Sequence, residues 1–249
     1  MTSAGDATTS VDSGISSDTG PGKDGPEASV LRCPEGMVEL ETFCIDRYEA
    51  YLVELQSDGT ERAHSPFATV DGLRIRAKVA SNVSPQGYIS QLQASAACAE
   101  AQKRLCSKSE FARACRGSLE TRTYPYGTKY QKGACNEGKG STVAKLFGSD
   151  SSKWTYANFN DPRLNQLSGT LASTGAYVQC VTDEGVFDLV GNLHEWGADS
   201  ADSSGHGRFR GGFYGDAEVN GSGCLYETKA HELSYHDYST GFRCCADLH

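Results

Sequence analysis

Ten cysteines constrain the folding of this 249-residue chain more than any other feature of its sequence. They are even in number and run from Cys33 to Cys245 without the paired Cys-x-x-Cys units of a structural zinc site. We therefore interpret them as disulfides, and buried free thiols in a reducing cytosol are the alternative. Because disulfides persist in oxidising compartments, the sequence predicts an extracytoplasmic protein, which would be periplasmic, on the cell surface or secreted.

The start of the sequence carries no signal for such a compartment. The stretch MTSAGDATTS has neither the basic nor the apolar region of a signal peptide, so we expect that an export signal is missing from this sequence or has been removed. Residues 1–30 are rich in Ser, Thr, Gly and Asp and are predicted to form a disordered linker before a folded domain at 31–249. A lipid anchor on a missing upstream cysteine would tether the domain to a membrane, and a plain unstructured terminus is the alternative.

Charge and hydropathy argue against two classes of partner. The chain has 23 Lys and Arg against 32 Asp and Glu, and its net charge of -9 disfavours a nucleic-acid or anionic-membrane surface. No segment approaches the roughly 20 apolar residues of a transmembrane helix. The expected ligand is a peptide, a protein or a glycan.

The folded part begins with the pattern of a hairpin. Alternating apolar residues predict short strands near 37–40 and 43–45, with a turn near Glu41-Thr42. A disulfide between Cys33 and Cys44 fits the geometry of this hairpin.

Two helices are predicted next. Ser90 with Gln93 and Ser107 with Glu110 have the spacing of capping boxes, which predicts helices near 91–102 and 108–116. Beyond residue 117 the chain has no helical period, and we expect loops and short strands, including a short buried strand near 186–190. The fold class is therefore α+β and loop-rich, with disulfides and bound ions as compensation for the long irregular stretch.

The stretch FDLVGNLHEW places His194 and Glu195 after a Gly-Asn turn. A zinc protease needs a second histidine four residues after the first, on the same helix face. Ala198 occupies that position, so a metallopeptidase is disfavoured.

Seven motifs in order resemble the formylglycine-generating enzyme, or sulfatase-modifying factor, domain family. The resemblance runs from about Cys33 to Asp247 and implies the family's variant of the C-type-lectin fold, with calcium bound. The motifs are GMVEL, FCIDRYEA, KRLCSKSEFARACRG, YPYG, GVFDLVGNLHEW, FRGGFYG and GFRCC.

The resemblance implies that the DLVGNLHEW segment wraps a structural calcium ion. Carried over residue by residue, the calcium ligands are Asp188, Gly191, Leu193 and Glu195. Hard oxygen ligands and a backbone that can curl at a glycine suit calcium. His194 is then a packing or surface residue. Asn136 is the candidate ligand of a second family calcium.

The chain departs from the family at the copper site. Active members carry two cysteines after an Arg-Gly-Gly-Ser turn, and their thiolates hold the copper ion that supports formylglycine formation. In RGGFYGDAEVNGSGC the first position holds Asp216, and the second falls near Gly221. Copper chemistry is therefore not expected, unless Cys224 is a free thiol.

A cluster of acidic residues and histidines follows in the C-terminal segment. Two histidines with a carboxylate are the composition of a non-haem iron site. The alternative is a surface loop of mixed polar residues that binds no metal. The catalytic candidates are Asp216, His231 and His236, with Glu218 and Asp237 in the same segment.

The family's pairing implies a disulfide between Cys98 and Cys244. For the other six cysteines, many pairings remain open. Our choice among them is Cys115 with Cys224, Cys106 with Cys245, and Cys135 with Cys180.

Two hypotheses compete for the function. The first is an extracytoplasmic binding or structural module of the cell envelope that lacks the copper-binding cysteines. The second is an oxidoreductase of the same family that acts on a peptide cysteine or a small thiol with an altered metal site.

Overall fold

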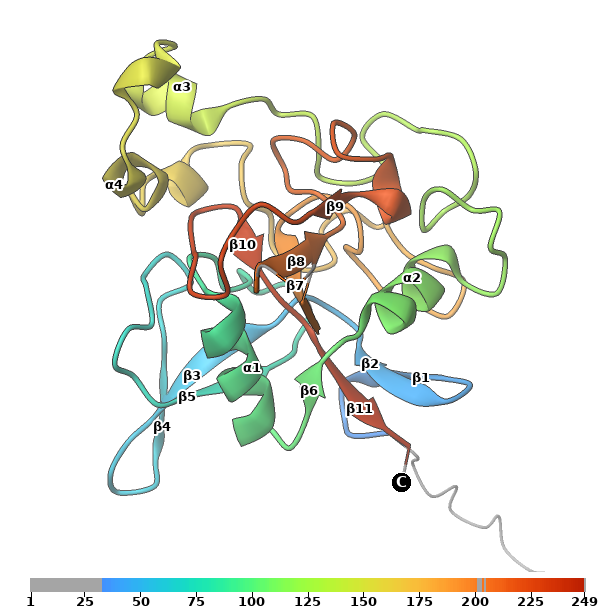
Figure 1. The fold of residues 1–249 in the computed structure, drawn as a ribbon. Coiled ribbons are helices and arrows are strands. Elements are labelled where there is room, and N and C mark those ends of the chain that lie inside the picture. The colour runs from blue at the N-terminus through green and yellow to red at the C-terminus, as the bar shows by residue number, and fades with distance from the viewer. Residues whose placement is uncertain (1–32, 201–202, 204, 249) are drawn as a thin grey trace, which may run out of the picture. The chain divides into compact units, whose positions relative to one another are not determined.

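The computed structural model describes residues 33–200, 203 and 205–248, in which three small sheets and two main helices alternate with long loops (Figure 1). The predicted linker at 1–30 lies outside the described residues. The α+β class is confirmed. None of the helices among the described residues has the length and apolar content needed to span a bilayer.

The first sheet joins the two ends of the described domain. Its strands are hydrogen-bonded in the order β1-β2-β11-β6, all antiparallel. Leu40 pairs with Phe43 across the turn, so the predicted hairpin is confirmed. The strands are β1 (Met37–Leu40), β2 (Phe43–Asp46), β11 (Cys244–Asp247) and β6 (Arg104–Leu105).

Two further sheets complete the framework. The second has the order β10-β7-β8-β9, and its β10–β7 pair is parallel. Its strands are β10 (Thr240–Gly241), β7 (His194–Ser200), β8 (Gly207–Arg210) and β9 (Glu227–Thr228). The third has the order β4-β3-β5, with the strands β4 (Glu61–Ala63), β3 (Tyr51–Leu55) and β5 (Ile75–Lys78).

Both predicted main helices are present with their capping boxes. Helix α1 covers Gln91–Glu100 and helix α2 covers Lys108–Arg116. In α2 the Ser107 amide donates to Glu110 Oε2 at 2.8 Å, while the Glu110 amide donates to Ser107 Oγ at 3.3 Å. Helix α1 ends two residues before the predicted end at 102, because Gln102 adopts a left-handed φ of 58°.

The expectation of no helix beyond residue 117 is wrong. Helices α3 (Thr142–Phe147) and α4 (Tyr156–Phe159) lie there, together with the 3-10 turns η1 (Ser151–Lys153), η2 (Leu164–Gln166) and η3 (Gly223–Leu225). A helix of four to six residues is too short to show a 3.6-residue period. Its local signal is the cap, such as Ser141 Oγ accepting from the Ala144 amide at 3.1 Å.

The expected buried strand at 186–190 is also not formed. Phe187 makes only an isolated bridge with Val181, and Asp188 has a φ of 60°, which interrupts an extended backbone. The apolar residues of this segment are nevertheless buried, as Val186, Leu189 and Val190 show. An apolar run therefore predicted burial correctly and backbone conformation wrongly.

Five disulfides join the elements, and they are the pairs chosen from the sequence: Cys33–Cys44, Cys98–Cys244, Cys106–Cys245, Cys115–Cys224 and Cys135–Cys180. All ten cysteines of the chain are used. The disulfides support an extracytoplasmic location.

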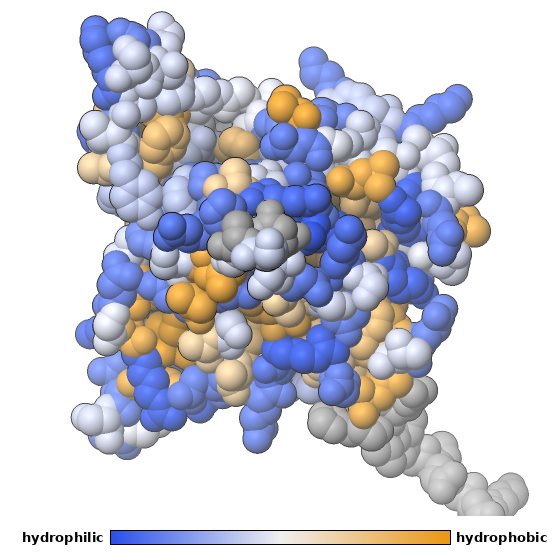
Figure 2. All heavy atoms as spheres, in the orientation of Figure 1, coloured by the Kyte–Doolittle hydropathy of each residue, from blue (hydrophilic) through white to orange (hydrophobic). Residues whose placement is uncertain are grey.

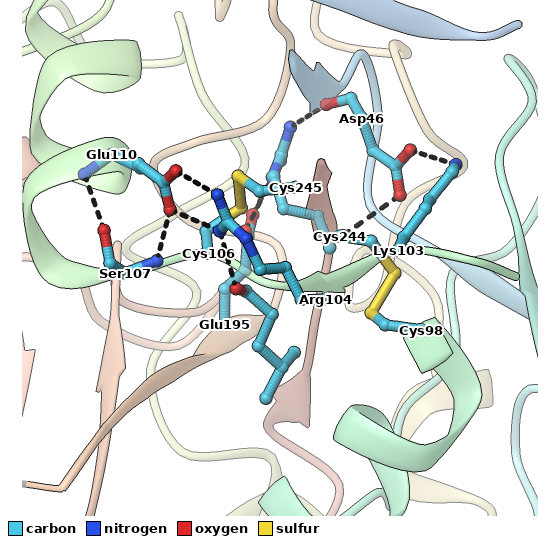
Figure 3. Close-up of a disulfide and its surroundings, with 12 residues drawn as sticks. Asp46, Cys98, Lys103, Arg104, Cys106, Ser107, Glu110, Glu195, Cys244 and Cys245 are labelled. Carbon is cyan, nitrogen blue, oxygen red and sulfur yellow. Dashed lines mark hydrogen bonds and ion pairs between the residues drawn. A yellow bond between two sulfur atoms is a disulfide. The ribbon is translucent and has the colours of Figure 1, made fainter. Parts of the chain in front are cut away.

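The adjacent cysteines of β11, Cys244 and Cys245, lie in two different hydrophobic cores. Successive strand residues point to opposite faces, so Cys244 and Cys245 cannot enter the same core. Cys244 joins Cys98 of α1 in the core that contains Trp196, whereas Cys245 joins Cys106 in the core of α2 (Figure 3). Strand β11 is therefore held by one disulfide on each of its two faces.

Removing a disulfide should cost more stability when the loop that it closes is longer, with a logarithmic dependence on loop length. Cys98–Cys244 spans 146 residues and Cys33–Cys44 spans 11. By chain entropy we expect a loss of about 5 kcal/mol for the paired Cys98→Ala/Cys244→Ala variant and about 3 kcal/mol for Cys33→Ala/Cys44→Ala. Urea unfolding with thiol titration of the denatured, unreduced protein measures both. Equal losses, or several free thiols in the wild type, would contradict this view.

Candidate metal centre

The turn between Phe187 and His194 has an unusual backbone. Asp188, Gly191 and Asn192 have φ angles of 60°, 77° and 57°, so three of five successive residues are left-handed. A Cβ atom at Gly191 would lie 2.2 Å from the carbonyl oxygen of Asn136, so only glycine fits there. These left-handed residues make the backbone curl, and the chain then continues directly into β7.

Three carboxylates are buried around this turn. Glu49, which follows β2, is fully buried, as are Asp188 in the turn and Glu195 in β7. Glu49 accepts from the Leu193 amide at 3.0 Å and from Asn192 Nδ2 at 2.5 Å, so it holds the turn in place. No pattern in the sequence indicates this role for Glu49, although it lies within the FCIDRYEA motif.

Asp188 is fixed by a backbone contact. Its Oδ2 accepts from the Gly175 amide at 2.7 Å. This contact brings the loop around residue 175 against the turn, which lies 13 residues away in sequence. The carboxylate therefore keeps further acceptor capacity on both oxygens.

A buried arginine pairs with one of these carboxylates, Glu195. Arg243 is 1% exposed, and its Nε and Nη2 each donate to Glu195 at 2.6 Å. The same guanidinium donates to the carbonyl oxygen of Asp46 at 3.1 Å and to that of Phe187 at 2.9 Å. This fork is the bidentate geometry that favours arginine over lysine.

The charges in this cluster are not balanced. Burial raises the pKa of Glu49 well above its ordinary value, and the neighbouring Asp188 and Glu195 raise it further. Burial raises the pKa of Asp188 to about 6, against the opposing effect of its bond from Gly175. Burial also raises the pKa of Glu195, although Arg243 opposes it. Three carboxylates with one guanidinium favour the binding of protons or of a cation.

Asn136 lies at the same turn. Its Nδ2 donates to Asn192 Oδ1 at 2.8 Å and to the Thr170 carbonyl at 2.9 Å, and its own carbonyl accepts from the Asn192 amide at 2.8 Å. Its Oδ1 is buried and has no hydrogen-bond partner among the described residues. Such an orphaned oxygen is an available ligand for a cation.

The donor set around the turn is made of hard oxygens, which suits calcium better than a soft metal. Among the described residues, no group of three or more His, Cys, Asp and Glu side chains is arranged to hold a metal. A calcium site of the implied kind does not need one, since Gly191 and Leu193 would contribute carbonyl oxygens beside Asp188 and Glu195. The residues present therefore fit a calcium ion in their chemistry.

His194, the first residue of β7, is buried among aromatic side chains. Its ring centroid is 4.7 Å from that of Phe209, 4.9 Å from Phe213 and 5.3 Å from Tyr226. Burial lowers its pKa to about 3, so it is neutral at physiological pH. It is a packing residue and not a surface residue. Ala198 lies on strand β7, so the helical pair of histidines in a zinc protease has no counterpart here.

The catalytic candidates of the C-terminal segment have separate local contacts. The Asp216 carboxylate accepts from the amides of Glu218 at 3.0 Å and Val219 at 3.2 Å, which closes its own turn. His236 Nδ1 lies 2.8 Å from Asn160 Oδ1. His231 stacks on Tyr235, with 3.8 Å between ring centroids.

Asp237 and Glu218 are also engaged. Buried Asp237 accepts from the Tyr235 hydroxyl at 2.7 Å and from the Ser239 hydroxyl at 2.7 Å. Glu218 accepts from the Tyr124 hydroxyl at 2.8 Å. The described residues of this segment thus form hydrogen bonds within the fold and do not converge as three metal ligands.

Comparison with known proteins gives one family match. The chain matches the model of the sulfatase-modifying factor enzyme 1-like domain over residues 2–248. No curated protein sequence matches it.

Several solved structures are similar to the chain. The U1 variant of the major tropism determinant is 17% identical over 88% of this chain and 54% of that chain, with a TM-score of 0.46. The I1 variant is 15% identical over 87% and 53%, with a TM-score of 0.47. CarF is 17% identical over 83% and 87%, with a TM-score of 0.44. The chain spans about half the length of the two tropism-determinant chains.

The charge imbalance predicts an inverted pH dependence for the cation-free protein. A raised pKa means that the folded state binds the proton more tightly than the unfolded chain does. The contribution of Asp188 to stability is therefore fully present below about pH 4 and is lost as pH rises through about 6. With chelator present, we expect the wild type to lose on the order of 2 kcal/mol more than Asp188→Asn between pH 4 and 7.

Asparagine suits this test because it tolerates a left-handed φ. Urea unfolding at each pH gives the two stability curves. Asp71→Asn, at an exposed aspartate, is the matched control and should keep the wild-type dependence. Parallel curves for the wild type and Asp188→Asn would refute the imbalance.

Proposed function

Because the chain belongs to the sulfatase-modifying factor enzyme 1-like domain family, we propose that it is a copper-free member that serves as a binding or structural module of the cell envelope. The observation that carries the proposal is that all ten cysteines lie in disulfides, which leaves no thiolate for Cu(I). Its ligand would be a peptide, a protein or a glycan. A lipid anchor upstream of the linker would keep it at the membrane.

Asp216, at the position of the family's first copper-binding cysteine, has a local structural role. Asp216 closes a tight turn and makes an isolated bridge with Phe213. A carboxylate is a hard ligand that does not replace a thiolate for Cu(I).

The second position does not accept a side chain. Gly221 has a φ of 111°, and a Cβ atom there would lie 2.7 Å from the Leu225 carbonyl oxygen. A cysteine at this position would therefore be strained and would clash with the backbone. The nearby Cys224 is bonded to Cys115. The backbone at Gly221 and the Cys115–Cys224 disulfide therefore both support the proposal that the chain has no copper site.

We also propose a structural calcium at the 188–195 turn, with side-chain oxygens from Asp188 and Glu195 and carbonyl oxygens from Gly191 and Leu193. Each oxygen of a carboxylate has two lone pairs, so Glu195 can accept from Arg243 and bind calcium at once. The excess of buried carboxylates supports a cation there. Asn136 remains the proposed ligand of a second calcium, supported by its buried and unbonded Oδ1.

Calcium should stabilise the protein through this turn. At a concentration 100 times the Kd, the gain is about 2.7 kcal/mol. We expect the rise in Tm on adding calcium to dialysed, chelator-treated protein to vanish in Asp188→Asn and to shrink in Glu195→Gln. Differential scanning calorimetry measures the rise in each variant, so any loss of stability from the mutation itself cancels. Glu120→Gln, at an exposed glutamate, should behave as the wild type. An equal rise in all variants would argue for calcium binding elsewhere.

The domain should not convert cysteine to formylglycine by the copper route. Copper-loaded protein is incubated with a peptide that contains Cys-x-Pro-x-Arg, and mass spectrometry follows the change from thiol to aldehyde. We expect no product, whereas a copper-active member of the family in the same assay gives product. Turnover that disappears in Cys224→Ala would instead favour the oxidoreductase hypothesis.

A further inference from the structure

A pocket of about 420 Å³ lies along helix α2, and we call it the α2 pocket. The β1–β2 turn contributes Glu41 to its lining, and the loop at 117–120 contributes the residues that follow the helix. The helix itself contributes four residues with the i, i+3, i+4, i+7 spacing of a single face, namely Ser109, Ala112, Arg113 and Arg116.

Small residues leave the room for this pocket. Ser109 and Ala112 extend little from the helix, and α2 ends where Gly117 takes a left-handed φ of 63°. A Cβ atom at Gly117 would lie 3.3 Å from Glu184 Oε2, so both conformation and space favour glycine there. Figure 1 shows α2 next to the β1–β2 hairpin, and Figure 2 shows both hydrophilic and hydrophobic residues over these two elements.

One of the two arginines in the pocket is neutralised within the fold. Arg113 Nη1 donates to Glu184 Oε1 at 3.0 Å, and its Nη2 donates to Glu41 Oε1 at 3.2 Å. Two carboxylates therefore already compensate this guanidinium, and an anionic ligand gains little from it.

The other arginine, Arg116, has no such partner. Among the described residues it forms no ion pair, and its Nη1 makes one long contact of 3.5 Å with the carbonyl oxygen of Glu120. Its Nε is buried and also lacks a hydrogen-bond partner in this part of the chain. A guanidinium is always charged and has five N–H donors, so the protein leaves most of the hydrogen-bonding capacity of Arg116 unused.

The position of Arg116 in the last turn of α2 accounts for only part of its charge. The C-terminus of a helix carries a partial negative charge of about half an elementary charge, which stabilises a nearby arginine. The same partial charge opposes an anion. Because it is smaller than the full charge of the guanidinium, a carboxylate in direct contact with Arg116 is still attracted.

We propose that the α2 pocket binds an α-carboxylate, of a free amino acid or of a peptide C-terminus, with Arg116 as the partner of the carboxylate. Two parallel N–H groups of a guanidinium match the two oxygens of a carboxylate. Glu41 and Glu120 in the same pocket disfavour a second negative charge, so a monoanion fits better than phosphate or sulfate. The substituent next to the carboxylate contacts Ala112.

This site rests on the proposed binding role and deepens it, because it names the group of a peptide ligand that the domain recognises. None of its residues belongs to the proposed calcium turn or to the positions of the family's copper-binding cysteines. A domain that binds no carboxylate could still be a copper-free module, and the formylglycine assay tests that role separately.

NMR titration of the isotope-labelled, disulfide-intact protein tests the site. The probes are N-acetylleucine and N-acetylleucinamide, which have nearly the same shape and differ in the negative charge. We expect saturable shifts of the Gly117 and Ser118 amide signals with N-acetylleucine and none with N-acetylleucinamide. In Arg116→Gln the affinity for N-acetylleucine should fall by on the order of tenfold or more, because a charge-assisted contact is lost.

Two further variants separate binding from folding. Ala112→Leu keeps every charge and a good helix former, but its larger side chain fills part of the pocket, so it should also weaken binding. Arg74→Gln removes the charge of an exposed arginine outside the pocket and should bind as the wild type does. Circular dichroism establishes that each variant is folded.

Free leucine and an N-acetylated peptide that ends in leucine distinguish the two sources of the carboxylate. Tighter binding of leucine than of N-acetylleucine identifies a free amino acid, whose ammonium group the glutamates of the pocket attract. Tighter binding of the peptide identifies a peptide C-terminus. The proposal is overturned by equal shifts with N-acetylleucine and N-acetylleucinamide, by the lack of a saturable shift, or by unchanged affinity in Arg116→Gln or, should that variant not fold, in Ala112→Leu.

Discussion

The buried guanidinium of Arg243 joins the parts of this domain that carry its candidate chemistry. It connects Glu195 on β7, the carbonyl of Asp46 at the end of β2 and the carbonyl of Phe187 at the start of the turn. Next to it, the amide of Cys244 donates to Asp46 Oδ2 at 3.0 Å, and Lys103 Nζ lies 2.6 Å from Asp46 Oδ1 (Figure 3). Removing one partner of such a buried pair typically costs about 3–5 kcal/mol. The two sheets and the turn are therefore coupled through one residue.

The same arginine defines the electrostatic character of the turn. It pairs with Glu195, whereas the hydrogen-bond donors to Glu49 and Asp188 among the described residues are backbone amides and the Asn192 side-chain amide. These contacts position the carboxylates without neutralising them. Oxygens that are already fixed in place would reduce the cost of ordering ligands around the proposed calcium ion.

Local signals in the sequence predicted the elements that local interactions form. The hairpin and both main helices were predicted because alternating apolar residues and two capping boxes act over a few residues. Short helices such as α4 were not predicted, because a single helical turn is too short to show a hydrophobic period. The role of Glu49 was not predicted for a different reason. Its hydrogen bonds reach residues 143 and 144 positions away, and no local pattern reports where its side chain points. The Asp188 carboxylate likewise accepts from the Gly175 amide, 13 positions away, which no local pattern reports. The proposed calcium ligands rest on the family resemblance and not on a local sequence pattern.

The order of the disulfides along the chain has a consequence for biosynthesis. Cys135–Cys180 lies inside the loop closed by Cys115–Cys224, and both lie inside the loops closed by Cys244 and Cys245. As the chain emerges from a ribosome or a translocation pore, Cys33–Cys44 is complete first, and among the nested disulfides the innermost pair, Cys135–Cys180, is complete before the others. The thiols of Cys98, Cys106 and Cys115 appear earlier but wait for partners made more than 100 residues later. Among the nested disulfides, the order in which both cysteines become available therefore runs from the inside outward, and the early thiols of Cys98, Cys106 and Cys115 are exposed to pairing with one another before their native partners are made.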